Sequence, residues 1–119
     1  MRQREDLCQL LRERAGALEV RLEAPFSVYI HGDFNLDNIL YDPVERRINF
    51  IDLHRSRQMD FVQDVTVHLI SNFRLPVYDS EIREQINRYI LDFYAFAREF
   101  AKNNNDRTFA LRCALGLTR

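Results

Sequence analysis

Hydrophobic residues recur with a helical period over much of the chain. Leucines and alanines fall at three- and four-residue spacing over residues 3–18, which predicts an amphipathic helix. A second apolar pattern over residues 62–73 predicts another helix, with Asp60 as its N-cap. Pro76 ends this segment, because proline cannot continue a helical hydrogen-bond ladder.

The clearest helix follows Asp79, which is positioned to cap it. Its apolar residues form one continuous stripe, which indicates a face that packs against the core. The stripe consists of Ile82, Ile86, Tyr89, Ile90, Phe93, Phe96, Ala97 and Phe100. A polar turn at residues 103–106 separates this helix from a last one, which is predicted from residue 107 onward.

The β-prone runs are few and short. Residues 26–30 predict one strand, and residues 39–41 and 48–51 predict two strands joined by a short turn. Residues 53–60 are polar and irregular, and we expect a loop there. The sequence therefore predicts a single α+β domain over residues 1–119, mostly helical, with one small β-hairpin.

The charge balance of the chain limits its partners. Its 17 basic and 18 acidic residues are interspersed and give a net charge of −1, so no basic face is available for a nucleic-acid backbone. All the basic residues are arginine except Lys102, and the three glycines stand far apart. A glycine-rich phosphate loop or a phosphate-binding lysine must therefore come from outside this chain.

Nothing in the sequence indicates a membrane or a secretory route. The longest apolar run falls far short of the ~20 residues that a transmembrane helix needs, and the polar N-terminus does not resemble a signal peptide. We expect a cytoplasmic protein that contacts no membrane. Cys8 and Cys113 lie in helical apolar patterns and are predicted to be buried, reduced thiols.

Candidate chemistry concentrates in residues 31–38, which read His-Gly-Asp-Phe-Asn-Leu-Asp-Asn, and at Asp52. If the two hairpin strands pair symmetrically, residue 39 faces residue 51. Asn38 then faces Asp52, at about 4.5–5.5 Å between their Cα atoms. An amide oxygen and a carboxylate could share one cation in that arrangement. Two oxygen ligands with open positions suit Mg²⁺, which takes its remaining ligands from water and substrate phosphates.

Asp33 lies on the loop before the first hairpin strand, where its carboxylate could face that cation without binding it. Such a group can orient an attacking hydroxyl and accept its proton in phosphoryl transfer. Each of these residues also has an ordinary structural interpretation. Asp33 could hydrogen-bond its own turn, Asn38 could cap the start of a strand, and Asp52 could cap a helix.

The ordered set His31-Gly32-Asp33, then Asn38, then Ile51-Asp52 resembles the signature of the aminoglycoside phosphotransferase/choline kinase family. The resemblance implies a protein-kinase-like fold, of which this chain is the C-terminal lobe, with the hairpin carrying the catalytic and metal residues. It implies Asp33 as the catalytic base. It also implies Asn38 and Asp52 as ligands of Mg²⁺ and, through the metal, of the ATP phosphates.

The same resemblance implies supporting residues. His31 would brace the catalytic loop, and Asp60 and Asp64 stand where the family has a further pair of aspartates. For Asp64, a structural role in the first turn of a helix is favoured. Residues 59–61 read Met-Asp-Phe where many members have Gly-Asp-Pro, and residues 53–54 read Leu-His where many have an aromatic residue first. These departures affect the choice of acceptor and leave the three chemical residues unchanged.

The implied function is transfer of the γ-phosphate of ATP to the hydroxyl of a small molecule of aminoglycoside, choline, homoserine or sugar type. The N-terminal lobe of the same polypeptide would supply the nucleotide clamp, so we expect a catalytic-lobe fragment that is inactive alone. The alternative is a degraded kinase lobe retained as a non-catalytic binding or scaffold module. A hydrolase that uses Asp33 and Asp52 as an acid–base pair would leave Asn38 unexplained.

Overall fold

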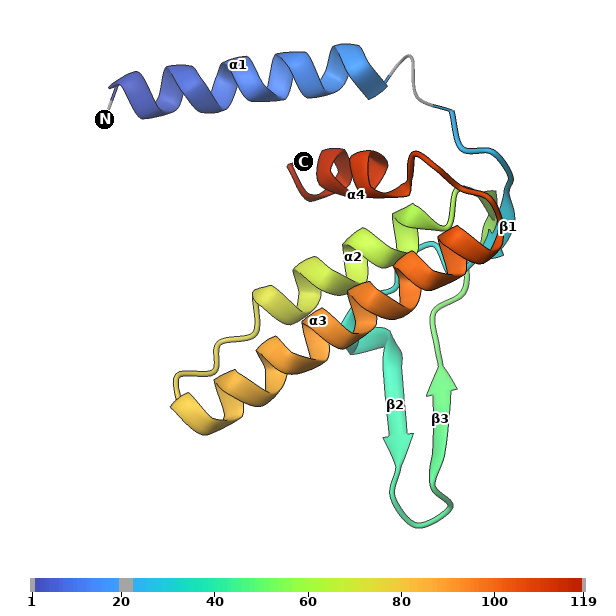
Figure 1. The fold of residues 1–119 in the computed structure, drawn as a ribbon. Helices are drawn as coiled ribbons and strands as arrows, with labels where there is room; N and C mark the ends of the chain where they lie inside the picture. The colour runs from blue at the N-terminus through green and yellow to red at the C-terminus, as the bar shows by residue number, and fades with distance from the viewer. Residues whose placement is uncertain (1, 20–22, 119) are drawn as a thin grey trace.

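The computed structural model describes residues 2–19 and 23–118. Within these ranges the chain forms four α-helices and four short strands (Figure 1). In chain order the elements are α1 Arg2–Glu19, β1 Val28–Ile30, the 3-10 turn η1 Leu36–Asn38, β2 Ile39–Asp42, β3 Arg47–Phe50, β4 Arg57–Met59, α2 Val62–Phe73, α3 Ser80–Asn103 and α4 Phe109–Leu117. The α+β class with dominant helices agrees with the prediction from sequence.

The four predicted helices are all present. The Asp79 side chain caps α3 as expected and accepts two N–H groups of its first turn, at 3.0 and 3.1 Å. At α2 the N-cap position falls on Phe61, which makes no side-chain cap. The carboxylate of Asp60, one residue earlier, accepts the Val62 N–H at 3.0 Å instead. The predicted cap is therefore displaced by one residue but still supplies a hydrogen bond to the helix.

The strands form two separate two-stranded sheets, β1 with β4 and β2 with β3, both antiparallel. The sequence did not predict β4, because Arg57-Gln58-Met59 is polar and lacks β-branched residues. Its pairing with β1 places Val28 opposite Met59. This pairing brings the segment before α2 alongside the strand that leads into the candidate loop.

The predicted register of the β2–β3 hairpin is wrong by one residue. Ile39 faces Phe50, and Asp42 faces Arg47, so the connecting loop has four residues where symmetric pairing required five. The Asp42 carboxylate holds this loop by accepting the N–H groups of its second and third residues, at 3.0 and 3.2 Å. Arg46 closes the loop with a φ of 54°. Asn38 therefore lies opposite Ile51 and not opposite Asp52.

The core lies where α2, α3 and α4 meet, and Phe61 is its aromatic centre. The Phe61 ring stacks on Phe26 and on Phe109, each with centroids 5.7 Å apart. Phe100 meets the same ring edge-on at 5.0 Å. The buried apolar residues of this core are Phe61, Val62, Val65, Leu69, Ile90, Ala97, Ala101, Phe109 and Cys113. Three helices and the segment before β1 therefore share one packed centre.

The apolar stripe of α3 belongs to this core only in part. Ile90 and Ala97 are buried, whereas Phe96 is 72% exposed and Ile82 is 49% exposed. The helix packs against α2 and α4 along one face, and the stripe is wider than that face. The prediction that the whole stripe packs into the core is wrong for these outer positions.

Cys113 is a buried, free thiol, as predicted. Burial raises its pKa to about 11, and the Arg112 charge opposes that shift only partly. The predicted state of the Cys8 thiol concerns a side chain outside the described residues. Among the described helices, none is both long and apolar enough to cross a membrane.

Candidate active site

The loop between β1 and β2 carries the candidate residues, and it begins with a conformation that requires glycine. Gly32 has a φ of +95°, in the left-handed region. A Cβ atom at this position would lie 2.2 Å from the backbone carbonyl oxygen of Arg55. The loop therefore passes so close to the segment before β4 that no side chain fits between them.

Gly32→Ala should accordingly lower the free energy of unfolding by about 1–3 kcal/mol, because it combines an unfavourable φ with a main-chain clash. Urea denaturation measures this change. Shortening Arg55 to alanine in the same protein should restore little of the lost stability, because the atom closest to the added Cβ is the backbone carbonyl oxygen of residue 55. Unchanged stability of Gly32→Ala would mean that the loop can move away from this segment.

Asp64 anchors the loop to α2 through the main chain. Its carboxylate accepts the N–H of His31 at 2.8 Å with one oxygen and the N–H of Gly32 at 3.1 Å with the other. Asp64 stands in the first turn of α2, so the helix presents a negative group where its own dipole stabilises one. Hydrogen bonds to a carboxylate are stronger than those between neutral groups. The start of the loop is thereby fixed to the start of the helix.

His31 joins the loop to the far strand of the hairpin. Its Nδ1 accepts the N–H of Asp33 at 3.1 Å, which requires an unprotonated Nδ1. The proton of the neutral ring then lies on Nε2, which donates to the carbonyl of Ile51 at 2.9 Å. The backbone carbonyl of His31 also accepts the Ser56 hydroxyl at 2.8 Å. One neutral imidazole therefore spans the distance between residue 33 and the end of the second hairpin strand.

Asp33 and Asn38 are in direct contact. The Asn38 amide nitrogen donates to the backbone carbonyl of Asp33 at 2.8 Å and to its carboxylate at 3.2 Å. The Asn35 amide donates to the other carboxylate oxygen at 3.0 Å. These bonds fix the orientation of the Asp33 carboxylate. The Asn38 side chain is buried, and its amide oxygen accepts no hydrogen bond from the part of the chain that the structure describes.

Asp52 directly follows the residue that pairs with Asn38 across the hairpin. The residue before it, Ile51, donates its N–H to the Asn38 carbonyl at 3.0 Å. Asp52 then adopts a φ of 63° and leaves the strand. Its exposed carboxylate contacts Nδ1 of His54 at 2.5 Å. The prediction that Asn38 and Asp52 face each other across the hairpin is therefore wrong.

The oxygen atoms of Asn38 and Asp52 still fit Mg²⁺ by chemistry. A neutral amide oxygen and a carboxylate are hard ligands, and Mg²⁺ commonly binds only one or two protein groups beside substrate phosphates. Among the side chains that the structure describes, no group of three or more His, Cys, Asp or Glu residues is arranged to hold a metal.

Comparison with known proteins adds one finding to this geometry. The chain matches the family model described as the phosphotransferase enzyme family, APH, over residues 2–101. It belongs to this family. The resemblance to aminoglycoside phosphotransferases is thus confirmed. No curated protein and no solved structure gives a significant match.

Sequence reasoning gave His68 a structural role without naming its partners and missed Ser71, and both side chains hold this loop of the phosphotransferase chain. The Ser71 hydroxyl accepts the N–H of Leu36 at 2.8 Å. His68 is buried, stacks on Phe34 and shares hydrogen bonds with the Phe34 carbonyl and the Tyr89 hydroxyl, at 3.3 and 2.7 Å. Burial lowers the pKa of His68, although the Phe34 carbonyl and the Asp64 charge oppose this shift. The four-residue spacing of Asp64 and His68 along α2 was the available signal.

A groove runs from this loop along the second half of α2, with a volume of about 530 Å³. Its lining residues are Asn35, Leu36, Asp37, Val67, Ile70, Ser71, Arg74 and Leu75. Asn35 therefore touches both the groove and the Asp33 carboxylate. The groove combines apolar side chains with one acidic and one basic group, a composition that suits a polar small molecule.

Proposed function

We propose that this chain is the catalytic lobe of an ATP-dependent phosphotransferase that phosphorylates a small-molecule hydroxyl, within a protein-kinase-like fold. The observation that carries the proposal is the contact of Asp33 with Asn38. A carboxylate is oriented by the amide of a residue whose own oxygen remains open, on a loop anchored by Asp64. Family membership supports the reaction class.

In this proposal Asp33 is the catalytic base. Its carboxylate orients the acceptor hydroxyl and takes its proton as the hydroxyl oxygen bonds to the γ-phosphorus of ATP. The bond between that phosphorus and the bridging oxygen breaks, and ADP leaves with the bond's electron pair. Phosphoryl transfer depends chiefly on positioning and charge stabilisation, and the two amide donors at 3.0 and 3.2 Å restrict the carboxylate accordingly.

Asn38 and Asp52 would hold the Mg²⁺ that accompanies ATP. When bound, this ion neutralises charge on the phosphates. Asn38 offers its open amide oxygen. Asp52 would exchange its contact with His54 for the metal, which an exposed side chain can do at small cost. His31 and Asp64 support the loop without touching the substrate, by the contacts described above.

We further propose that a nucleotide-holding lobe of the same polypeptide completes the site. The chain contains one lysine, Lys102, and no cluster of glycines, whereas kinases cover the phosphates with both features. The hairpin supports this proposal because it leaves large apolar side chains uncovered. Leu40, Tyr41, Ile48 and Phe50 are each about half exposed or more, and such a surface is typical of an interaction site.

The groove along α2 is the proposed place for the acceptor. It adjoins the base through Asn35, and it would hold the part of the acceptor that does not react. Asp37 offers a carboxylate to a cationic group, and Arg74 offers a guanidinium to an anionic one. Aminoglycoside, choline, homoserine and sugar acceptors all remain candidates by size.

One observation favours the second candidate, a non-catalytic module of the same family. The Asp52 carboxylate contacts Nδ1 of His54, so one of the two proposed metal ligands already has a partner. If His54 holds Asp52 permanently, Mg²⁺ cannot recruit it. Replacing His54 by alanine separates the two candidates, since it should strengthen Mg-ATP binding in an enzyme and have no effect in a module that binds no nucleotide.

The test of the proposed function is a phosphoryl-transfer assay on the polypeptide that includes the nucleotide-holding lobe. We expect Mg²⁺-dependent transfer from ATP to at least one member of a panel of amino alcohols, aminoglycosides and sugars. The chain of residues 1–119 alone should turn over negligibly and bind Mg-ATP weakly, because it lacks the phosphate clamp. Micromolar ATP binding to this chain by isothermal titration calorimetry would contradict the two-lobe proposal.

A further inference from the structure

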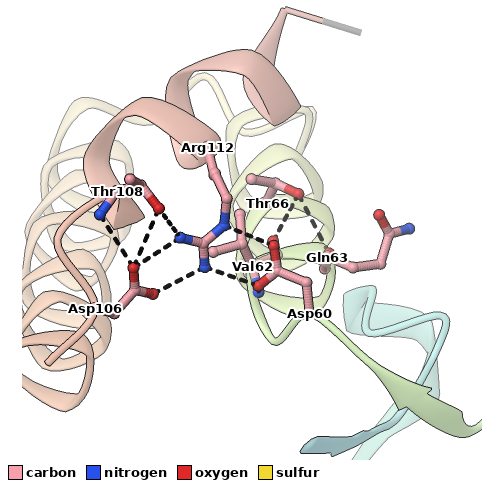
Figure 2. A network of polar contacts seen from close by, with 7 residues as sticks. All are labelled: Asp60, Val62, Gln63, Thr66, Asp106, Thr108 and Arg112. Carbon is pink, nitrogen blue, oxygen red and sulfur yellow. Dashed lines mark hydrogen bonds and ion pairs between the residues drawn. The ribbon is translucent and has the colours of Figure 1, made fainter. Parts of the chain in front are cut away.

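Arg112, in α4, uses its whole guanidinium group inside the protein (Figure 2). Nε and Nη2 donate to the two carboxylate oxygens of Asp60 at 2.8 and 3.0 Å. Nη1 and Nη2 donate to the two carboxylate oxygens of Asp106 at 2.7 and 2.8 Å. Nη1 also donates to the Thr108 hydroxyl at 2.6 Å. These five bonds match the five N–H donors of an arginine side chain.

Arg112 and Asp106 are shielded from water, whereas the Asp60 side chain is 25% exposed. The side chain of Arg112 is 6% exposed and that of Asp106 is fully buried. Buried charges are retained only where hydrogen bonds and opposite charges compensate their desolvation. The arginine therefore has one low-energy position, between two carboxylates on different segments. Arg112 lies outside the range that matches the family model, residues 2–101.

Asp60 transmits this fixed position to α2. The oxygen that accepts Nη2 of Arg112 also accepts the N–H of Val62 at 3.0 Å. The Asp60 carbonyl accepts the N–H of Gln63 at 3.1 Å. Both donors belong to the first turn of the helix, as does Asp64. Arg112 thus sets where the first turn begins, and Asp64 projects from that turn.

We infer that Arg112 is a positioning residue for the catalytic loop, acting through Asp60, the first turn of α2 and the bonds of Asp64 to His31 and Gly32. The inference rests on the proposed function, because it takes residues 31–38 as the catalytic loop. A hydrogen bond to a carboxylate is sensitive to a few tenths of an ångström. Displacement of the helix start would therefore release the two loop N–H groups first.

Arg112→Lys tests this coupling in the chain of residues 1–119. Lysine keeps the charge but cannot bind two carboxylates side by side with a planar fork. We expect the amide hydrogens of His31 and Gly32 to exchange at least about tenfold faster, measured by nuclear magnetic resonance. The amides of Ile90 and Ala97, in the core part of α3, should change by less than about threefold. Arg88→Lys, at an exposed pair with Glu84, is the matched control and should change neither set.

A double variant separates positioning from general stability. In an Asp64→Ala protein, His31 and Gly32 have already lost their acceptor, so adding Arg112→Lys should accelerate their exchange no further. Equal acceleration with and without Asp64, or equal acceleration of the α3 amides, would overturn the inference. If Arg112→Lys does not fold, Asp60→Asn serves in its place, because asparagine can still accept the Val62 N–H while losing one oxygen for the guanidinium.

A kinetic measurement connects the coupling to the reaction. In the polypeptide with its nucleotide-holding lobe, Arg112→Lys should lower kcat by at least about tenfold and change the KM for ATP by less than about twofold, since the loop positions the reacting groups. Unchanged kcat would overturn the positioning role. The exchange measurements do not depend on catalysis. If the proposed function is wrong, no phosphoryl transfer will be detected, but the exchange measurements will still show whether Arg112 is linked to the loop.

Discussion

Replacing Asp33 by asparagine should lower the kcat of phosphoryl transfer by about a thousandfold, the loss typical of removing a general base. Asparagine has nearly the same shape but cannot accept the proton of the attacking hydroxyl at neutral pH. It keeps one of the two oxygens that accept the amides of Asn35 and Asn38. The loop should therefore stay in place, and Mg-ATP binding should persist. Steady-state kinetics and titration calorimetry on the two-lobe polypeptide measure both quantities.

Asp92→Asn is the matched control for Asp33→Asn. Asp92 is an exposed carboxylate of α3, so the same chemical change there should leave kcat unaltered. Equal activity of Asp33→Asn and the unmodified protein would remove Asp33 from its role as base. Loss of Mg-ATP binding together with turnover would instead assign Asp33 to the metal.

Replacing Arg112 by methionine should lower the free energy of unfolding by about 3–5 kcal/mol, the cost of breaking a buried ion pair by removing one partner. Methionine fills similar volume but leaves two carboxylates without their cation. Most of this loss of stability should come from Asp106, because its side chain is fully buried. Urea or guanidinium denaturation of residues 1–119 measures the loss. Arg88→Met is the control, because the Arg88–Glu84 pair is about three-quarters exposed and such pairs contribute at most about 0.5 kcal/mol.

Lowering the pH should narrow the difference in the free energy of unfolding between Arg112→Met and the unmodified protein. Burial alone would raise the pKa of Asp106, but hydrogen bonds and charge from Arg112 outweigh it and hold the pKa below the ordinary value of 3.8. The stabilisation is therefore present above pH 3.8 and is lost as the pH falls through the lower pKa of the folded state. In Arg112→Met the cation is gone, so burial raises the pKa of Asp106. Protonation at low pH then removes a buried charge that has no partner, and this stabilises the folded variant. If the difference in the free energy of unfolding stayed constant down to pH 3, this account of the network would be wrong.

Local patterns predicted the helices well. The apolar period of residues 62–73 and the cap at Asp79 both depend on residues close together in sequence, and both are present in α2 and α3. Helix formation follows such short-range signals because each turn closes its own hydrogen bonds. The contact of Asp33 with Asn38 is equally local, at five residues, and the sequence motif was enough to single out both residues.

The predictions that were wrong about the strands share one physical origin, because each depended on non-local pairing. A one-residue change in loop length, set by the Asp42 carboxylate and the left-handed Arg46, shifted the hairpin register and placed Ile51, and not Asp52, opposite Asn38. Strand β4 depends on β1 for its pairing and carries no β-prone pattern of its own. Side-chain direction alternates along a strand, so an error of one residue reverses the predicted contact.

The Arg112 network could not be predicted from the sequence, for a related reason. Asp60 and Arg112 are joined across 52 residues, and nothing in the amphipathic pattern of α4 shows which arginine turns inward. Most arginines are exposed, and burial of a charged residue is decided by partners that arrive only with the tertiary structure.

The loop is held by acceptors that bind main-chain N–H groups, and this has a consequence for how its chemistry can change. Asp64 binds the N–H groups of His31 and Gly32, and Ser71 binds that of Leu36. Every amino acid except proline carries such a donor. Substitutions at Leu36 and Asp37 can thus alter the groove wall while the path of the chain stays the same. If the proposed function holds, a fixed backbone with replaceable side chains allows one scaffold to acquire new acceptor preferences by single point mutations.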